Sequence, residues 1–408
     1  MKHKMKWVAN TMPKTDCSKE LSLMSVEEIQ KVRKFHSSFP QYSPTPLNEL
    51  RELGKRFDAG SIFVKNESFR FGLNAFKVLG GSFAMARFIA QQTGRDVDDL
   101  GFDQLTSPVV KKDLGDFTFY TATDGNHGRG VAWAANQIGQ HSVVYMPKGS
   151  SQTRLDNIRK EGADASITDM NYDDAVRLAY ANSQKHPNSV VIQDTAWEGY
   201  EEIPGWIMQG YGTMASEAAY QLKAAGIDRP THIFVQAGVG SLAGAVVGFF
   251  TNLYPDNPPV MTVVEAQVAD CLYRSAVKGD GSLEKVGGDL STIMAGLACG
   301  EGNTISWEIL KNKASFFVSL PDYDAARAMR VMAVPLKGDP TVISGESGAA
   351  GLGCLLEAIE NPEYADFKEA LGIDEHSRIL LFSTEGNTDP DWFRRVVWDG
   401  VYSMDDED

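Results

Sequence analysis

Apolar runs of strand length alternate along this chain with longer segments that have helical spacing. The runs are continuous and do not alternate with polar residues, which is typical of strands buried on both faces in a parallel sheet. Strands are predicted at 61–65, 117–121, 142–146, 165–169, 189–193, 231–235, 261–265 and 378–383, and helices at 25–35, 75–92, 128–139, 152–161 and 172–184. The pattern predicts an α/β fold in which mostly parallel, twisted sheets are flanked by helices.

The length of the chain bears on its division into domains. A chain of 408 residues is too long for one ordinary hydrophobic core and fits two domains. We predict a smaller α/β domain at 87–193 and a larger domain made of residues 1–86 and 194–408.

Composition and charge exclude several classes of protein. Hydrophobic residues make up 43% of the chain and charged residues 23%, as in an ordinary globular protein. The net charge of −15 disfavours nucleic acid and anionic membranes as partners, because both require clustered Lys and Arg. No apolar stretch approaches the roughly 18 residues of a membrane span, and no apolar run follows Met1–Val8 as it would in a secretory signal. The expected location is the cytoplasm.

The cysteines give no indication of a metal site. Cys17, Cys271, Cys299 and Cys354 are scattered and form no Cys-x-x-Cys pair, so no zinc or other metal is expected. A cytoplasmic location favours thiols, but a disulfide between Cys271 and Cys299 stays open at this point.

The first candidate for chemistry is Lys77, which lies in the stretch Asn74-Ala75-Phe76-Lys77-Val78-Leu79-Gly80-Gly81. Burial among apolar neighbours lowers the pKa of an ammonium group, and this suits an amine that must attack a carbonyl. The alternative is a lysine that buries only its apolar stem and keeps its charge in water.

The second candidate is the turn Thr123-Asp124-Gly125-Asn126-His127-Gly128, between a predicted strand and a predicted helix. The start of a helix after such a turn binds anions, for example a substrate carboxylate. The alternative is an ordinary strand-to-helix turn. Taken alone, His127 is interpreted as structural.

The third candidate is the glycine-rich loop in Gln236-Ala237-Gly238-Val239-Gly240-Ser241, which again joins a strand to a helix. Small residues allow backbone N–H groups to close on a phosphate. A dinucleotide-binding module is the alternative, although the loop lacks the Lys-Ser/Thr of a P-loop.

The fourth candidate is the pair of hydroxyl residues Ser383 and Thr384, which ends the strand 378–383. α/β sheets bind ligands at the carboxyl ends of their strands. If the ligand contained a pyridine ring, a neutral hydroxyl beside the ring nitrogen would leave that nitrogen less protonated than a carboxylate would. Such a state of the ring favours elimination over transamination. The alternative is a simple transition from strand to turn.

These motifs, in this order and preceded by Thr45-Pro46-Leu47, resemble the fold-type II pyridoxal-phosphate (PLP) enzymes, which include threonine deaminase, cysteine synthase and the tryptophan synthase β-subunit. The resemblance covers about Pro44 to Asp389. Within that group the chain is most similar to the diaminopropionate ammonia-lyases. The stretches that carry this likeness are 70–77, 123–134, 169–174, 193–200 and 345–348.

The resemblance implies a role for individual residues. Lys77 forms the Schiff base with PLP and later acts as a base, and Asp124 is a second acid/base group. Asn126 donates to the phenolic oxygen of PLP, and the amides of Gly238, Val239, Gly240 and Ser241 hold its phosphate. Ser383 faces the pyridine nitrogen, with Thr384 as the neighbour that could replace it. Asp194 recognises the distal amine of the substrate, and Gly125 and His127 complete the substrate site with Asp124. Val239 departs from the nearly all-glycine loop of many relatives, which puts the set of phosphate donors in doubt.

The expected reaction is the PLP-dependent elimination of ammonia from D- and L-2,3-diaminopropionate, which yields pyruvate and two ammonia. Lys77 and Asp124, on opposite faces of the substrate, would each remove the α-proton of one enantiomer. The substrate is thus a small amino acid, and relatives suggest a homodimer. The alternatives are a serine or threonine dehydratase on the same scaffold, a nucleotide-binding module without PLP, and a binding protein that has lost its chemistry. Retention of Lys77 argues against the last of these.

Overall fold

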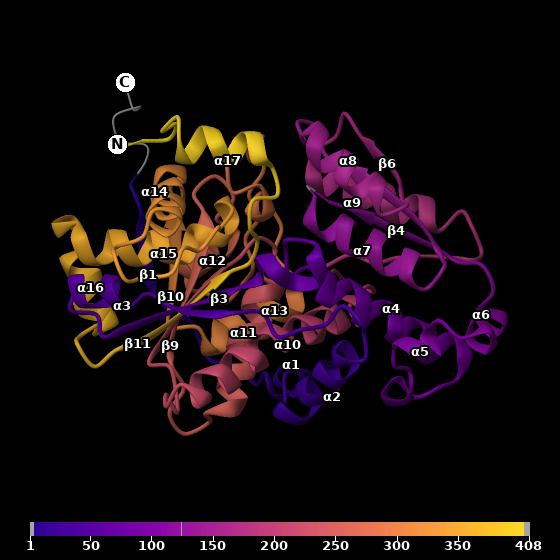
Figure 1. The fold of residues 1–408 in the computed structure, drawn as a ribbon, viewed down its shortest axis with the longest axis horizontal. Helices are drawn as coiled ribbons and strands as arrows, with labels where there is room; N and C mark the ends of the chain where they lie inside the picture. Colours follow the sequence, from indigo (N-terminus) through magenta and orange to yellow (C-terminus); the bar gives the residue numbers. More distant parts are fainter. Residues whose placement is uncertain (1–3, 124, 404–408) are drawn as a thin grey trace.

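Two sheets of different size organise the chain in the computed structural model, which describes residues 4–123 and 125–403. Figure 1 shows the large sheet on one side and the small sheet, drawn in magenta, on the other. The large sheet has seven strands in the order β1-β10-β9-β8-β11-β3-β2, and the small sheet has four in the order β6-β5-β4-β7. This arrangement confirms the predicted α/β class with two sheets.

The large sheet is parallel in its centre and antiparallel at both edges. Its strands are β1 Lys6–Ala9, β2 Leu47–Glu49, β3 Ser61–Asn66, β8 His232–Gln236, β9 Val260–Ala266, β10 Phe316–Leu320 and β11 Arg378–Ser383. The central strands pair in parallel, whereas β1 pairs antiparallel with β10 and β2 antiparallel with β3. The two edge strands were not predicted, because they are short, half-exposed and lack a continuous apolar run. β10 is apolar and buried like its neighbours and was also missed.

The small sheet is parallel throughout. Its strands are β4 Thr118–Ala122, β5 His141–Met146, β6 Asp164–Ile167 and β7 Ser189–Val191. The helices between them are α7 Asn126–Gln137, α8 Gln152–Lys160 and α9 Tyr172–Ser183. A separate cluster of buried side chains lies between β5, α7 and α8. The domain limits at 87 and 193 stay a prediction, although all four strands lie between them.

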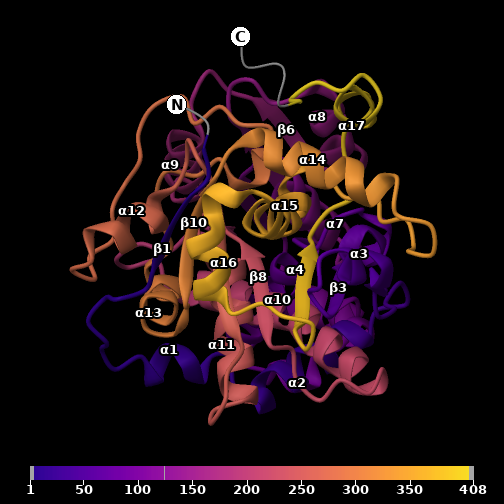
Figure 2. The same cartoon turned by 90° about the vertical axis from the view of Figure 1, so that its left-hand side faces the viewer.

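Helices cover both faces of the large sheet. α15, at Glu346–Glu360, packs on β8 to β11, and α11, at Ser241–Leu253, packs on the opposite side together with α10, at Glu202–Ala224 (Figure 2). The remaining α-helices are α1 Ser18–Ser22, α2 Val26–Ser37, α3 Arg51–Arg56, α4 Val78–Thr93, α5 Phe102–Leu105, α6 Pro108–Leu114, α12 Cys271–Lys278, α13 Thr304–Lys313, α14 Asp322–Ala333, α16 Ala365–Leu371 and α17 Pro390–Val397. No helix in the described ranges is both long and apolar enough to span a bilayer.

The helix predicted at 75–92 begins later than expected. α4 starts at Val78, and Lys77 is its N-cap residue. The chain before it turns sharply, with positive φ angles of 49° at Phe71 and 62° at Asn74. Local hydrophobicity cannot reveal such a turn, because it depends on contacts with the distant segment that follows β11. The consequence is that Lys77 lies at a helix start and not within a helix.

All four cysteines are buried thiols. The disulfide between Cys271 and Cys299 that the sequence left open is therefore absent from the structure. Burial, together with Glu265, raises the pKa of the Cys271 thiol well above its usual value, so this thiol stays protonated.

Candidate active site

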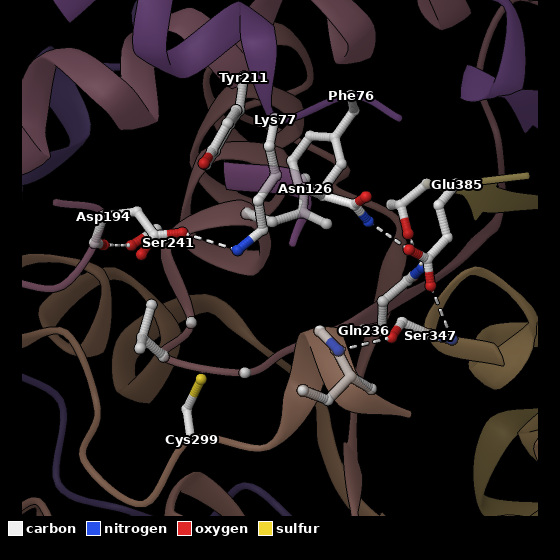
Figure 3. Close-up of a pocket in the computed structure, with 17 residues that line it drawn as sticks. Phe76, Lys77, Asn126, Asp194, Tyr211, Gln236, Ser241, Cys299, Ser347 and Glu385 are labelled. Carbon is white, nitrogen blue, oxygen red and sulfur yellow. Dashed lines mark hydrogen bonds and ion pairs between the residues drawn. The ribbon is translucent and has the colours of Figure 1, made fainter. Parts of the chain in front are cut away.

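One pocket collects residues from the starts of α4 and α7, from the loops after β7 and β8, and from the segment after β11. Figure 3 shows their side chains around a common space. Eight residues singled out from the sequence line it, namely Lys77, Asn126, Asp194, Gly238, Val239, Gly240, Ser241 and Thr384. Segments up to about 300 residues apart in the sequence therefore meet at one site.

Lys77 points its amine into this pocket. Its Nζ atom lies 2.8 Å from Oδ2 of Asp194, and 15% of the side chain is exposed. The preceding residue is fixed to the large sheet, because the amide of Phe76 donates to the carbonyl oxygen of Thr384 at 3.0 Å. The amine is thus turned inward on an anchored backbone, which excludes a lysine that keeps its charge in bulk water.

Asp194 is held from several sides. Its side chain is 3% exposed, and the hydroxyl of Tyr172 donates to Oδ1 at 3.3 Å. Its backbone oxygen accepts from the Ser241 hydroxyl and, at 3.1 Å, from Nδ2 of Asn303. Burial alone would raise the pKa of Asp194, but the Lys77 ammonium, followed by His127, holds it well below its usual range. Asp194 is therefore a fixed negative charge in the wall of the pocket.

The glycine-rich loop forms a cradle at the N-terminus of α11. Gly240 has a φ of +97°, and a Cβ on Gly238 would lie 3.0 Å from the backbone oxygen of Gly296 and 3.2 Å from Sγ of Cys299. None of the amides of Gly238, Val239 and Gly240 donates to another group within residues 4–123 and 125–403. Free amides at the positive end of a helix dipole are the donors that a phosphate requires.

Comparisons with known proteins agree with this geometry. A family model described as pyridoxal-phosphate dependent enzyme matches residues 39–368. A diaminopropionate ammonia-lyase from Salmonella typhimurium is 52% identical over 381 residues, which are 93% of this chain and 94% of that protein. The chain belongs to the diaminopropionate ammonia-lyase family of PLP enzymes.

Solved structures of the family superpose closely on this one. The Escherichia coli diaminopropionate ammonia lyase in complex with D-serine has a TM-score of 0.91 at 46% identity, with 98% of each chain covered. The same enzyme in complex with an aminoacrylate-PLP azomethine reaction intermediate has a TM-score of 0.88 at 45% identity, also with 98% of each chain covered. The predictions of a fold-type II fold and of PLP as cofactor are confirmed, and the glycine-rich loop is not a dinucleotide site.

PLP fits the pocket of this diaminopropionate ammonia-lyase family member. The cofactor needs an amine, a set of phosphate donors and a partner for its ring nitrogen. Lys77, the cradle after β8 and a hydroxyl at the end of β11 supply these groups around one space. No group of three His, Cys, Asp or Glu side chains that could hold a metal gathers in the part of the chain that the structure describes.

The two hydroxyl residues at the end of β11 have different surroundings. The Ser383 hydroxyl is fully buried and donates to the Ser344 hydroxyl at 2.9 Å, and Ser383 is not among the residues that line the pocket. Thr384 lines the pocket, and its hydroxyl accepts from Nε2 of Gln236 at 2.9 Å. The structure thus brings Thr384, the second choice from the sequence, into the pocket, whereas Ser383 lies outside its lining.

The turn before α7 is only partly in the pocket. Asn126 lines it, but Gly125 and His127 do not. His127 is buried, and its Nε2 lies 2.8 Å from the backbone oxygen of Ile192, in keeping with its structural interpretation. Asp124, the predicted second base, lies outside the described residues.

Several lining residues were not predicted from the sequence. They are Phe76, Tyr211, Gln236, Leu242, Gly296, Leu297, Cys299, Ser347 and Glu385. Ser347 belongs to a stretch that carries the family resemblance, and Glu385 directly follows the Ser383–Thr384 pair, so these signals could have identified them. Tyr211 had no signal, because it lies in the long helix α10, and only packing turns its hydroxyl toward Asp194 and Lys77 (Figure 3).

Proposed function

We propose that this protein catalyses the elimination of ammonia from 2,3-diaminopropionate, with pyruvate and two ammonia as products. The 52% identical relative named diaminopropionate ammonia-lyase supports this assignment. The E. coli relative with a bound aminoacrylate intermediate supports an α,β-elimination as the reaction type.

Different residues of the pocket hold different parts of the cofactor. Lys77 provides the amine that joins the aldehyde carbon, and the amides of Gly238, Val239, Gly240 and Ser241 hold the phosphate. Asn126 donates to the phenolic oxygen. Thr384 places a neutral hydroxyl by the ring nitrogen, with Ser383 behind it. When bound, PLP acts as an electron sink that acidifies the α-proton of the substrate.

Asp194 is the observation that carries the choice of substrate. Its carboxylate is buried and ionised, and in this structure the Lys77 ammonium at 2.8 Å balances its charge. With its nitrogen joined to the cofactor, Lys77 would no longer supply a free ammonium beside this carboxylate. A buried carboxylate without a counter-ion is costly, so the pocket favours a substrate that brings a second ammonium. Diaminopropionate carries this group, whereas serine does not.

Two bases on opposite faces would explain the use of both enantiomers. Lys77 takes the α-proton from one face, and Asp124 takes it from the other. The proton that ammonia needs in order to leave Cβ comes from Lys77, once protonated, or from Asp124. Gly125 and His127 complete the substrate site through the turn before α7.

The test of the reaction is a product count. Purified enzyme is incubated separately with D-diaminopropionate, L-diaminopropionate, D-serine and L-serine, and pyruvate and ammonia are measured. We expect two ammonia per pyruvate and a higher kcat/KM for diaminopropionate than for serine. A serine dehydratase would instead release one ammonia per pyruvate and turn over serine faster.

The test of the second base is a substitution. Asp124→Asn should reduce turnover of D-diaminopropionate by on the order of 10²-fold or more and should affect the L-isomer much less. Equal losses for the two enantiomers would contradict a base on each face.

The location and the assembly are further proposals. The buried thiols support a cytoplasmic location, because disulfides are rare in reducing compartments.

A homodimer is supported by exposed apolar residues between α14 and α15, namely Val334, Leu336 and Ile343. Sedimentation equilibrium at micromolar concentration tests this assembly, and a monomer mass would exclude it.

A further inference from the structure

Glu385 lies in the wall of the pocket, opposite the Lys77–Asp194 pair (Figure 3). It follows β11 and is 4% exposed. Its Oε2 accepts from Nδ2 of Asn126, and its Oε1 accepts from the backbone amide of Ser347 at 3.2 Å. The carboxylate therefore connects the start of α7, which follows β4 of the small sheet, with the start of α15, which covers the large sheet.

The backbone of Glu385 is fixed as well. Its carbonyl oxygen accepts from the amide of Gly345 at 2.9 Å, and its main chain forms a bridge with Ala75, two residues before Lys77. The side chain therefore starts from a rigid position. A carboxylate held in this way can orient a neighbour, because its own position is already fixed and costs no further conformational entropy.

The charge state of Glu385 follows from its neighbours. Glu346 is 3% exposed, and burial, followed by repulsion from Glu385, raises the pKa of Glu346 to about 7, against the attraction of Arg154. Two buried carboxyl groups that repel each other do not both ionise easily. Glu385 accepts from two N–H groups, which favours its ionised form.

An ionised carboxylate determines how the amide of Asn126 is turned. A carboxylate only accepts hydrogen bonds, whereas an asparagine amide has a donor end and an acceptor end of nearly the same size. Beside Glu385, Asn126 must present its NH₂ end. That end has two N–H bonds, and its hydrogen bond to Oε2 of Glu385 engages one of them.

We propose that Glu385 is a positioning residue that fixes the amide of Asn126 so that its second N–H bond is available to the phenolic oxygen of the cofactor. This inference rests on the cofactor contact proposed above for Asn126. With Glu385 in place the amide has one orientation. Without it, the carbonyl end of Asn126 can turn toward the cofactor, where two oxygen atoms would repel each other.

Glu385→Gln is the informative substitution, because it reverses the polarity of the contact. The Ser347 amide donates to Oε1 of Glu385 at 3.2 Å and would hold the oxygen of the new amide. The new NH₂ group would then face Asn126, which must turn its carbonyl to accept from it. The variant therefore places Asn126 in the wrong orientation without a change in side-chain size.

The experiment is a double-mutant cycle on cofactor affinity. Apoenzyme is titrated with PLP, and the Kd is measured by protein fluorescence for the original protein, Glu385→Gln, Asn126→Ala and the double variant. We expect each single change to weaken PLP binding about tenfold, which corresponds to about 1.4 kcal/mol. In the Asn126→Ala background the Glu385→Gln change should alter the Kd by less than about twofold, because no amide is left to orient.

Control variants separate this role from a loss of folding. Glu357→Gln changes another buried glutamate of the α15 region, which accepts from Asn361 away from the pocket, and it should leave the PLP Kd unchanged. Glu385→Ala removes the carboxylate but adds no wrong donor, so its loss should be smaller than that of Glu385→Gln. Thermal unfolding of the apoenzymes identifies any variant whose lost affinity reflects lost structure.

The outcomes distinguish the two proposals. If Asn126→Ala leaves the Kd unchanged, the proposed cofactor contact of Asn126 is wrong. If Asn126→Ala weakens binding but Glu385→Gln does not, or if the two losses simply add in the double variant, the positioning role of Glu385 is wrong. If Glu385→Ala weakens binding as much as Glu385→Gln does, the orientation of the amide is not what Glu385 supplies.

Discussion

Two lysines of the large sheet region, Lys65 and Lys77, differ in what surrounds the amine. Lys65, in β3, is fully buried, and its Nζ donates to Thr45, Glu217 and Gln221 at 2.7, 2.7 and 2.9 Å. Lys77 keeps 15% of its side chain exposed and lines the pocket, 2.8 Å from Asp194. Both lysines contact a buried carboxylate, so burial next to an acid does not by itself identify a reactive amine. A reactive amine is identified instead by its access to the pocket and by a partner that can be replaced.

The surroundings of Lys65 are closed. Glu217 accepts from Lys65 and Arg70, and Arg70 also donates to Glu67, with each of these side chains at most 1% exposed. Burial would raise the pKa of Glu217, but Arg70 and then Lys65 lower it to about 2. Two cations and two anions balance here, and every donor of the Lys65 ammonium is used. A network of this kind holds structure and offers no room for chemistry.

The largest expected effect separates the functions of the two lysines. Lys77→Ala should reduce turnover of diaminopropionate by on the order of 10⁴-fold, because both the cofactor linkage and a base are lost. The protein should remain folded, since this amine borders a pocket. Steady-state kinetics and circular dichroism measure the two properties. Residual activity above about 1% would contradict the assignment of Lys77.

The matching change at the other lysine should act on stability. Lys65→Met removes one partner of a buried ion network and should lower the free energy of unfolding by about 3 to 5 kcal/mol. Urea denaturation followed by fluorescence measures the loss. Lys55→Met serves as the control, because the Lys55–Glu52 pair is exposed and should contribute less than about 1 kcal/mol. If the two variants were equally stable, Lys65 would not anchor the fold.

A smaller effect concerns His36, which packs near the closed network. Its Nδ1 lies 2.7 Å from the Thr213 hydroxyl and its Nε2 lies 3.0 Å from the Leu79 oxygen. Burial, followed by the charge of Arg70, lowers the pKa of His36 from 6.5 to about 3. Below pH 6.5 the unfolded chain therefore binds a proton that the folded chain excludes, and stability falls as the pH falls.

The contribution of His36 can be isolated by substitution. Between about pH 6 and pH 4.5, protonation of His36 in the unfolded chain should lower the free energy of unfolding by about 2 kcal/mol. This loss should disappear in His36→Asn. Denaturation at a series of pH values measures the slope. His376→Asn is the control, since His376 is exposed and should leave the slope unchanged. A slope that survives in His36→Asn would show that other groups carry it.

The smallest expected effect concerns Tyr172, whose hydroxyl holds Asp194 next to Lys77. Tyr172→Phe removes the hydroxyl that donates to Asp194 at 3.3 Å and accepts from Gln193 at 2.8 Å. We expect the KM for diaminopropionate to rise about fivefold with kcat nearly unchanged. The reason is the loss of about 1 kcal/mol from the hydrogen bond that orients Asp194. Tyr254→Phe, whose hydroxyl donates to the Asp228 backbone, is the control. A fall in kcat alone would place Tyr172 in the chemistry instead.

The sequence analysis singled out Lys77 but not Lys65, for a physical reason. Lys77 lies in a local stretch of apolar and glycine residues, so its setting is visible in a few neighbours. The partners of Lys65 are Thr45, Glu217 and Gln221, which only the tertiary fold brings to it. Buried ion networks built from such separated residues leave no local pattern.

Other differences between expectation and structure follow from backbone geometry. The motif at the end of β11 identified Ser383 and Thr384 together, but only the tertiary structure shows that Thr384, and not Ser383, lines the pocket. In the same way, the turn before α4 decides that Lys77 lies at a helix start. The central parallel strands other than β10 were predicted, because continuous apolar runs are a local property.

The central claim is that, of Lys65 and Lys77, only Lys77 carries the cofactor. Borohydride reduction of the PLP-loaded enzyme converts a lysine-bound imine to a stable amine, and peptide mapping by mass spectrometry then locates it. We predict the added pyridoxyl mass on the peptide that contains Lys77 and its absence from the peptide that contains Lys65. The label on Lys65, or on neither lysine, would contradict the account.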